Sequence, residues 1–573
     1  MDLAILRSKF IKNRDLFILS LLSIALFEFI FGFHLVDFQN IHWLPDDAFN
    51  GFLGWSFYRN AEETFPLFNI YSYGMGIGST IIYTDSLPIF ALIFKPFASF
   101  LPLDFQYFGL WLLLSFFLTA FFGNKILTKI GLNFISKFFV VIILLLSPIV
   151  LERFIAGHFN LMSHWIILWG ISLYQNREEK ISRWLLIILV SILTHGYLFS
   201  MTIGIAIFSY IASIRDFSET KLYSNKKNIY NILLLLIFSI CALTAFGYFE
   251  VQADEVFHGG WGGYRLDLLS FINPIGRSLN WSYILGDLFA FQPSKIGDLI
   301  EGFNYFGLGI LLNILLAILI ILKERFFSHE IIKISGRAKI LFIFSVLLIL
   351  FSLTNNVTLG GNELFTYNMP EFLKPLTKPF RASARFFWPV YYLIFILSIF
   401  INFNYFKKNY FKQNQYSSIN ILFLFIMLIQ IVDISPGIRT IKTFTNKDYI
   451  ANVARNYPKQ TKLANATKSY KKIIYVFPEY ANKNWRELVY FAYRNSKDIN
   501  FGYFARRNWD TQKKYIVDIE RSFDISNLDK ESAYYFSDKL KFNEYYKKVS
   551  LTSKQITITN PNNVVHMLIL PNK

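Results

Sequence analysis

Long apolar runs, separated by short polar stretches, recur along the first three quarters of the chain. A helix needs about 20 mainly apolar residues to cross a bilayer, and runs near that length are read as candidate spans. Such runs lie at residues 16–36, 105–124, 134–151, 159–174, 183–197, 198–214, 229–249, 303–322, 338–354, 386–402 and 418–434. The pattern predicts an all-α polytopic membrane bundle with about 11 transmembrane helices.

A further apolar run, 86–101, is shorter and is interrupted by Lys95 and Pro96. Loops on the cytoplasmic side of a membrane are enriched in Lys and Arg. With a cytoplasmic N-terminus and 86–101 not crossing, most basic residues between the runs fall on that side, whereas a crossing would reverse every later loop. We therefore expect 86–101 to be a re-entrant or interfacial helix within the outer loop 37–104. The same topology places the loops 152–158, 250–302 and 355–385, and the tail, outside.

The pattern changes after residue 436. KIIYVF (472–477), INFGYF (499–504), AYYF (533–536) and VVHMLIL (564–570) are typical of strands, and NWRELVYFAYRN (484–495) has helical spacing. The sequence therefore predicts two domains, a transmembrane domain at 1–436 and a small extracytoplasmic α/β domain at 437–573. The tail has no glycine-rich phosphate loop, so we do not expect it to bind a nucleotide.

Composition supports a membrane protein, because 54% of the residues are hydrophobic and only 17% are charged, against about 25% charged in an ordinary soluble domain. The net charge of +18 is concentrated in the tail, where 25 Lys and Arg residues face 12 Asp and Glu residues. No Walker, Rossmann, zinc or Ser-His-Asp pattern is present, and nucleic acid is not an expected partner. The single cysteine, Cys241, excludes an internal disulfide.

Two acidic residues, Asp46 and Asp47, follow the first apolar run in the segment HWLPDDAFNGF (42–52). A carboxylate at the outer membrane face can accept a proton from a hydroxyl group or hold a metal ion. The alternative is an ordinary hydrophilic loop with solvated acids. Against it, Trp43, Phe49 and neighbouring aromatic residues indicate a membrane-hugging segment, where acids are costly and usually functional.

Three further stretches carry candidate chemistry on the outer side. In YSYGMGIGSTIIYTDSLP (71–88), three glycines allow close backbone approach and Asp85 adds an acid; a turn that only serves packing is equally compatible. In ERFIAGHFN (152–160), four polar side chains can orient a sugar or a phosphate, or simply cap two helices. They are Glu152, Arg153, His158 and Asn160.

The third stretch, KPFRASARFFWPVYY (378–392), places Arg381 and Arg385 four residues apart, which is one face of a helix. Two guanidinium groups at the membrane edge suit a phosphate or diphosphate head group, because arginine binds phosphate through two parallel hydrogen bonds. The alternative is that both side chains snorkel to the interface beside an aromatic belt.

With these motifs in view, the chain resembles the GT-C superfamily of polytopic glycosyltransferases. PDDAFNGFLGW (45–55) is similar to the acidic motif that those enzymes keep in the first outer loop, and Asp46 falls where their catalytic aspartate stands. YTDSLPIFALIFKPF, SPIVLERFIAGHFNLMSHWIIL and RASARFFWP more closely resemble uncharacterised bacterial GT-C-like membrane proteins. The likeness covers residues 10–435 in layout and leaves the tail unmatched.

The resemblance implies transfer of a sugar from a polyprenyl-phosphate donor to a glycan or lipid acceptor at the outer face of the bacterial cytoplasmic membrane. Asp46 would act as the base or orient the acceptor, and Asp47 would support it or hold a divalent cation such as Mg²⁺ or Mn²⁺. Arg381, Arg385 and Arg153 would neutralise the departing lipid phosphate. The basic tail would attract a polyanionic acceptor or membrane lipids.

Two other functions stay open at this stage. A transporter or flippase of lipid-linked saccharide would also be polytopic, although such proteins usually carry polar residues at the membrane midplane. Here the polar residues gather at the outer edge. A non-catalytic envelope assembly protein would keep the same scaffold without the chemistry.

Overall fold

The computed structural model describes residues 3–78, 80–216, 222–251, 261–277, 279–286, 301–327, 335–410, 416–453, 460–478, 485–506, 509–559 and 565–572. The chain forms two compact units. The helical unit comprises residues 1–37, 107–240 and 256–449, and the mixed unit comprises residues 38–106, 241–255 and 450–573. Both units are therefore discontinuous along the chain. The domain boundary expected after residue 436 stays a prediction.

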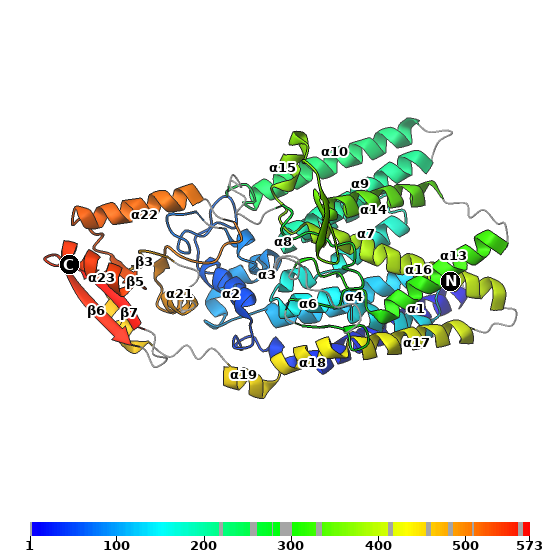
Figure 1. Ribbon diagram of the computed structural model, residues 1–573, viewed down its shortest axis with the longest axis horizontal. Helices are drawn as coiled ribbons and strands as arrows, with labels where there is room; N and C mark the ends of the chain where they lie inside the picture. The colour runs from blue at the N-terminus through cyan, green and yellow to red at the C-terminus, as the bar shows by residue number, and fades with distance from the viewer. Residues whose placement is uncertain are drawn as a thin grey trace. The chain divides into compact units, whose positions relative to one another are not determined.

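The helical unit is built from long helices that lie roughly side by side (Figure 1). They are α1 (Leu3–Ile30), α4 (Phe108–Ile130), α5 (Phe134–Leu145), α6 (Pro148–Ile155), α7 (Trp165–Gln175), α8 (Ile181–Thr194), α9 (Gly196–Asp216), α10 (Leu222–Ala245), α13 (Leu308–Phe327), α14 (Gly336–Leu353), α16 (Trp388–Tyr410), α17 (Ser417–Asp433) and α18 (Ser435–Phe444). Short 3-10 turns connect them: η1 (Phe33–Val36), η4 (Phe159–Met162), η5 (Glu371–Leu373), which runs into α15 (Lys374–Thr377), and η6 (Ser383–Phe387). The helix α19 (Lys447–Val453) follows α18.

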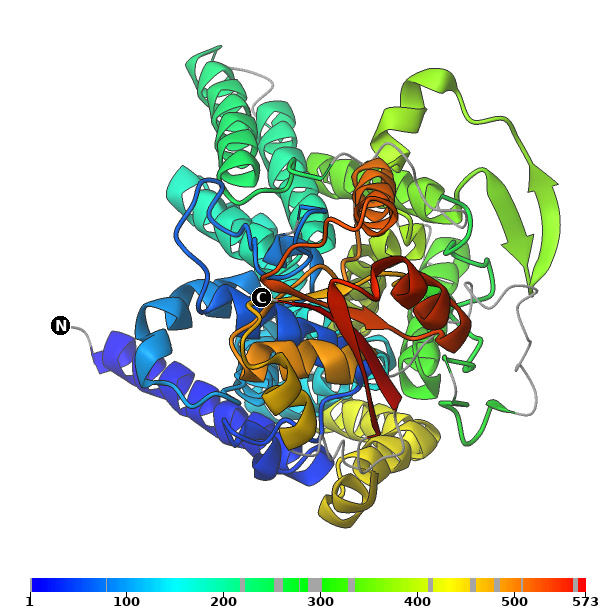
Figure 2. The ribbon, with the colours of Figure 1, turned by 90° about the vertical axis from the view of Figure 1, so that its left-hand side faces the viewer.

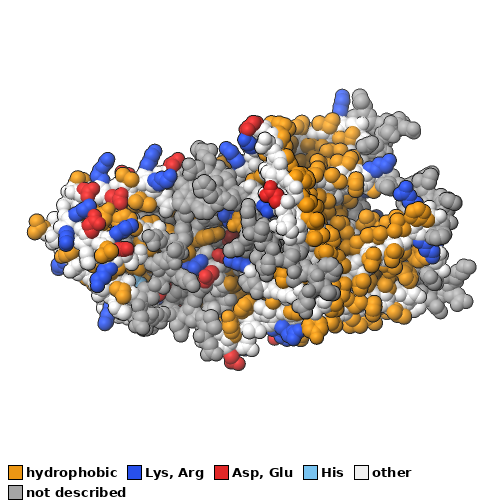
Figure 3. Space-filling view, viewed as in Figure 1, with side chains coloured by type: hydrophobic (Ala, Val, Ile, Leu, Met, Phe, Trp, Pro, Cys, Tyr) orange, Lys and Arg blue, Asp and Glu red, His pale blue; other side chains and the backbone are white. Residues whose placement is uncertain are grey.

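Within the described residues, 6 helices are long and apolar enough to cross a membrane, or up to 7 if the bent pair α17 and α18 is one span. Hydrophobic side chains gather over much of the visible surface of these helices (Figure 3). Each of the eleven predicted runs lies on a helix, but α7 has 11 residues and α8 has 14, which is short for a bilayer. The multi-pass membrane protein is confirmed, whereas the count of eleven spans is not.

Polar side chains buried between helices help to fix their pairing. Asn402 on α16 donates from Nδ2 to Asn313 Oδ1 on α13 at 2.8 Å, and Asn313 Nδ2 donates to Ser398 Oγ at 2.6 Å. All three side chains are buried. Hydrogen bonds between apolar helices hold them in one register, because lipid offers such groups no partner.

A buried carboxylate at the end of α17 anchors the loop that leads into α13. Asp433 accepts hydrogen bonds from the hydroxyl of Ser282, from Tyr305 Oη at 2.6 Å and from the backbone N–H of Leu308 at 2.9 Å. The segment between residues 301 and 308 is therefore held against the bundle. This segment carries a residue of the site described below.

A hairpin follows α14. Strands β1 (Asn356–Leu359) and β2 (Asn362–Thr366) pair antiparallel and are joined by Gly360 and Gly361. Both glycines have positive φ, 59° and 83°, which a two-residue hairpin turn requires. The carboxylate of Asp267 accepts both of their backbone N–H groups at 3.0 Å, so the turn is tied to the preceding loop.

The mixed unit contains a five-stranded sheet with the strand order β4-β3-β5-β7-β6. Its strands are β3 (Lys472–Tyr475), β4 (Asp498–Ile499), β5 (Ser532–Phe536), β6 (Ser553–Thr559) and β7 (Val565–Pro571). Strand β3 is parallel to β4 and β5, and β7 is antiparallel to β5 and β6. The accompanying helices are α20 (Thr461–Thr467), α21 (Trp485–Arg494), α22 (Trp509–Asp524) and α23 (Lys539–Val549).

The predicted small α/β fold of the tail is confirmed. One face of the sheet packs against α22 and α23 through Phe523, Phe542 and Tyr545, which meet Tyr534 and Phe536 of the sheet. The expected helix at 484–495 is α21. The segment 499–504 is wrong as a full strand, because β4 ends at Ile499. The irregular backbone that follows approaches Tyr73 closely at Gly502, where a Cβ atom would lie 2.3 Å from the Tyr73 ring.

The segment 38–106 belongs to this mixed unit, and its elements are α2 (Asp46–Tyr58), η2 (Ile81–Tyr83), α3 (Pro88–Phe94) and η3 (Lys95–Phe100). Backbone hydrogen bonds join Ser72, Gly74 and Met75 to Ile499 of β4, so the segment extends the edge of the sheet. The predicted helix at 86–101 is present as α3 and η3 and is too short to span a bilayer. Its position at the membrane interface stays a prediction.

Candidate functional site

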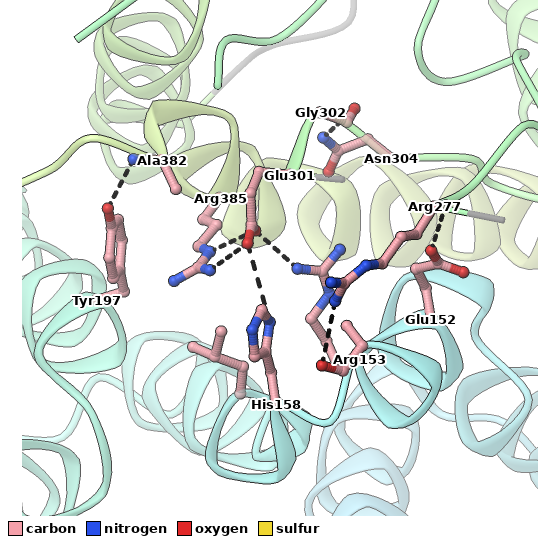
Figure 4. A network of polar contacts seen from close by, with 12 residues as sticks. Glu152, Arg153, His158, Tyr197, Arg277, Glu301, Gly302, Asn304, Ala382 and Arg385 are labelled. Carbon is pink, nitrogen blue, oxygen red and sulfur yellow. Dashed lines mark hydrogen bonds and ion pairs between the residues drawn. The ribbon is translucent and has the colours of Figure 1, made fainter. Parts of the chain in front are cut away.

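Four charged or titratable side chains meet inside the helical unit (Figure 4). Arg385 donates from Nε and Nη2 to the carboxylate of Glu301 at 2.8 and 2.6 Å. Arg153 donates from Nη1 to the same carboxylate at 2.7 Å, and His158 Nδ1 lies 3.8 Å from it. Both arginines and Glu301 are buried. We call these four residues the Glu301 cluster.

Three separate elements bring the Glu301 cluster together. Arg153 lies near the end of α6, which begins at Pro148, and the chain then turns at Gly157, whose φ is 74°, so that His158 follows on the same side. Arg385 lies on η6, directly before α16. Glu301 precedes α13 on the segment that Asp433 holds in place. The cluster therefore joins elements that are far apart in sequence.

Glu152, next to Arg153, points to a different set of partners. Its carboxylate accepts the backbone N–H of Arg277 at 2.7 Å and Nε1 of Trp281 at 2.6 Å. A Cβ atom at Gly276 would lie 2.7 Å from Glu152, so the loop approaches closely. Asn160 is buried and accepts the backbone N–H of Leu161 at 2.9 Å, which fits a structural role in η4. Substrate-binding roles for both residues stay predictions.

The carboxylate of Glu301 is bound by two guanidinium groups. Burial raises the pKa of Glu301, but the nearby Arg385 and Arg153 outweigh burial and hold that pKa below its usual range. The carboxyl group is therefore ionised at neutral pH. Buried charges are kept in proteins where they are paired and hydrogen-bonded, as Arg153, Arg385 and Glu301 are here.

Arg381 is not part of the cluster. The expectation that Arg381 and Arg385 share one helical face is wrong, because Arg381 precedes η6 and the helical turn begins at Ser383. The turn directs Arg385 inward, whereas Arg381 is exposed and lies over the ring of Tyr264, with 5.6 Å from Cζ to the ring centroid. A role of Arg381 in binding phosphate stays a prediction.

The acidic pair occupies the first turn of α2 in the mixed unit. Pro45 precedes the helix, and Asp46 and Asp47 are placed where the helix dipole favours negative charge. The two neighbours differ in exposure, since Asp46 is exposed and Asp47 is half-buried. They therefore have different surroundings, as expected for adjacent helical residues.

Asp46 has a cationic neighbour from the C-terminal part of the chain. Its Oδ2 lies 3.4 Å from Nη1 of Arg486 on α21, and the two side chains are 64% and 17% exposed. Arg486 is fixed by a hydrogen bond from Nε to Asn50 Oδ1 at 2.8 Å and lies over the ring of Trp485. The acidic motif is thus held by residues more than 400 positions away in sequence.

The glycine-rich segment before Asp85 is closely packed at one of its glycines. Gly74, Gly76 and Gly78 all have positive φ, and a Cβ atom at Gly76 would lie 2.3 Å from the ring of Tyr515. Asp85 itself has φ of 58°, in the turn between η2 and α3. Its substrate-binding role stays a prediction.

Two residues of these groups were not foreseen from sequence. Glu301 stands directly before an apolar run, where an acid is costly, and that position was the available signal. Arg486 lies in a segment with helical spacing among many other basic residues and carries no distinguishing signal. The mixed unit contains Asp46, Asp47 and Asp85, whereas the helical unit contains the Glu301 cluster.

Among the described residues, no group of three or more His, Cys, Asp and Glu side chains could hold a metal ion. Asp46 lies beside the guanidinium group of Arg486, which has the charge that a metal ion would supply. The residues around the acidic pair do not fit a metal site, and we derive no step through a metal ion.

These features define a multi-pass membrane protein that carries a compact α/β domain. The model of a domain of unknown function, DUF6311, matches residues 20–435, and the model of the DUF6311 C-terminal domain matches residues 462–556. The chain therefore belongs to the DUF6311 family. A comparison with curated proteins finds no match.

One solved structure with a similar course of the chain is the crystal structure of an oligosaccharyltransferase from Archaeoglobus fulgidus, in complex with zinc and sulfate. The two chains are 11% identical, and the match has a TM-score of 0.41 and covers 96% of this chain and 72% of the other. At this level of likeness the comparison carries no argument about activity.

Proposed function

We propose that this protein is a membrane glycosyltransferase that moves a sugar from a polyprenyl-phosphate donor to a glycan or lipid acceptor of the cell envelope. The observation that carries the proposal is the Glu301 cluster. Two arginines converge on one carboxylate inside a bundle of apolar helices. Buried charge in a membrane protein is costly and usually functional.

The Glu301 cluster suits a lipid-borne phosphate for a physical reason. Guanidinium groups bind phosphate oxygens through paired hydrogen bonds, and a lipid donor presents its phosphate at the membrane edge. Arg153 and Arg385 would bind the phosphate while still holding Glu301, or they would release Glu301 and bind the phosphate in its place. His158, the most exposed member of the cluster, would be the first to meet the arriving head group.

The acidic pair would act on the acceptor. Asp46 accepts the proton of an acceptor hydroxyl, whose oxygen forms a bond to the anomeric carbon of the sugar. The bond from that carbon to the phosphate oxygen breaks, and its electron pair leaves with the lipid phosphate. Arg486 orients Asp46 through their ion pair, and Asp47 supports it from the same helical turn.

The proposed setting is the bacterial cytoplasmic membrane, with the N-terminus on the cytoplasmic side and the C-terminal domain outside. Nucleotide sugars are found mainly in the cytoplasm, so a lipid carrier is the donor that this side of the membrane offers. The excess of Lys and Arg in the loops assigned to the cytoplasmic side supports the orientation.

The proposal is tested by measuring sugar transfer in membranes that contain the full-length protein or its Asp46→Asn and Asp47→Asn variants. Removing a general base costs about 100-fold or more in rate, so we expect Asp46→Asn to lose transfer by that factor. Glu62→Gln, an exposed acid in the same segment, is the matched control and keeps the rate. Unchanged transfer in both aspartate variants would contradict the assignment of the base. Loss of lipid-linked saccharide export without any transferase activity would favour a transporter.

A further inference from the structure

The hairpin β1–β2 and the turn that follows it expose a row of large hydrophobic side chains. Leu364 and Phe365 are 51% and 56% exposed, and Phe372 is 78% exposed. Leu359 and Tyr367 are exposed as well. In Figure 2 the two strands stand at the margin of the helical unit, beyond its helices. We call residues 359–373 the hydrophobic edge.

The outer strand of this hairpin has neither face covered. All five residues of β2 are exposed. Leu364 is the extra residue of a β-bulge, because Val357 pairs with Phe365 and Thr358 pairs with Glu363. In water, an exposed edge strand with large apolar side chains would invite aggregation. The hydrophobic edge therefore needs a non-aqueous neighbour.

The course of the chain identifies that neighbour. The hairpin begins three residues after α14, a candidate membrane span, and the next candidate span begins at Ser383. On α14, Phe342, Leu347 and Leu350 are exposed, as expected for side chains that face lipid. The hydrophobic edge thus continues a lipid-facing surface and is tethered to the membrane at both ends.

We propose that the hydrophobic edge lies in the bilayer interface, with Leu364, Phe365 and Phe372 inserted between the lipid head groups. The interface suits both the polar backbone groups of the edge strand and its large apolar side chains. The unpaired backbone groups of the edge strand need water or head groups, which the hydrocarbon core lacks. Aromatic side chains are enriched at this level of the membrane. The inference does not depend on the proposed transferase activity.

The proposal can be tested by site-directed spin labelling, because the chain has a single cysteine that is easily replaced. In full-length protein with Cys241→Ala, a nitroxide label is attached to Phe365→Cys or Phe372→Cys, and the protein is placed in phosphatidylcholine and phosphatidylglycerol nanodiscs. Collision of the label with oxygen, which concentrates in lipid, is compared with collision with a water-soluble nickel complex. Leu350→Cys on α14 is the lipid-facing control. Leu551→Cys, 95% exposed in the C-terminal domain, is the water-facing control.

We expect the oxygen-to-nickel ratio at residues 365 and 372 to exceed the ratio at residue 551 several-fold and to approach that at residue 350. A ratio equal to that at residue 551 would place the hydrophobic edge in water and overturn the proposal. Low collision with both reagents would mean that protein covers it, which overturns the proposal too. If Phe365→Cys fails to fold, Leu364→Cys at the exposed neighbouring position gives the same reading.

Discussion

At the scale of single residues, Glu301 holds two buried arginines of the helical unit, since both Arg153 and Arg385 donate hydrogen bonds to its carboxylate. Removing one partner of a buried charge network is costly, about 3–5 kcal/mol, because the remaining charges are left uncompensated. Under the proposed function the carboxylate also occupies hydrogen-bonding positions that a phosphate would use. Glu301 would then have opposite effects on stability and on anion binding.

We predict that Glu301→Gln unfolds at a lower temperature than the parent protein but gains more stability from geranylgeranyl phosphate. The variant deprives Arg153 and Arg385 of the Glu301 carboxylate, and a phosphate that binds the folded state in its place restores hydrogen bonds to both. Thermal unfolding in detergent, with geranylgeraniol as the neutral ligand, measures both effects. Glu324→Gln at the far end of α13 is the control variant. An equal response to phosphate in parent and variant would show that Glu301 does not compete with the anion.

A second residue gives the C-terminal domain a dependence on pH. His566 on β7 is fully buried against the ring of Tyr535, and burial lowers its pKa to about 4. The unfolded chain titrates at about 6.5. The folded state is therefore favoured above pH 6.5, and this contribution is lost as the pH falls from about 6.5 towards 4, by up to about 3 kcal/mol.

We expect hydrogen exchange of β5 and β7 in the full-length protein to speed up between pH 7 and pH 5, after correction for the intrinsic rate. His566→Leu removes the titrating group and should flatten this dependence. His42→Gln alters an exposed histidine and should leave the pH dependence of hydrogen exchange unchanged. The same pH dependence in His566→Leu would assign the effect to other groups.

At the scale of elements, short polar contacts between apolar helices and close turns decide the architecture. The α13–α16 pair depends on Asn313 and Asn402, which have no water to replace a lost partner. We predict that Asn402→Leu destabilises the protein by about 1–2 kcal/mol because Asn313 is left with an unmet donor or acceptor. The double variant Asn313→Leu, Asn402→Leu should recover part of the loss. The free energies of unfolding in mixed micelles give the double-mutant cycle. Losses that simply add would contradict the coupling between Asn313 and Asn402.

The elements also show what the sequence could and could not predict. Apolar runs predicted helices because burial in lipid requires their length and composition, and each predicted run is helical. The count of eleven spans is not confirmed, since α7 and α8 are apolar but short. Arg153, His158 and Arg385 were foreseen from local motifs. Glu301, which joins them, could not be placed because its contacts come from loops far apart in sequence.

At the scale of the whole molecule, the mixed unit unites the first loop with the C-terminal domain. Asp104 accepts hydrogen bonds from Tyr490 at 2.7 Å and Arg494 at 3.0 Å, and Arg59 donates to the carbonyls of Ala98 and Pro102. Periodicity could predict the strands and helices of the tail. It could not predict this union, because pairing between distant segments leaves no repeating pattern.

We predict that deleting residues 450–573 leaves the apolar helices inserted but exposes α2. Hydrogen exchange within 46–58 should rise strongly, since α2 loses its contact with α21. Arg494→Ala, which removes one half-exposed ion pair worth about 0–1 kcal/mol, is the mild control. Unaltered exchange of 46–58 in the shortened protein would show that the first loop folds by itself.

The long reach from Asn50 to Arg486 has a consequence for biogenesis. The ribosome releases the acidic segment early and α21 only near the end of translation. The first loop therefore lacks its contacts with α21 during most of the synthesis. A truncated nascent chain would insert into the membrane yet display Asp46 without its counterion. The acidic motif can therefore reach its final arrangement only after α21 has been synthesised.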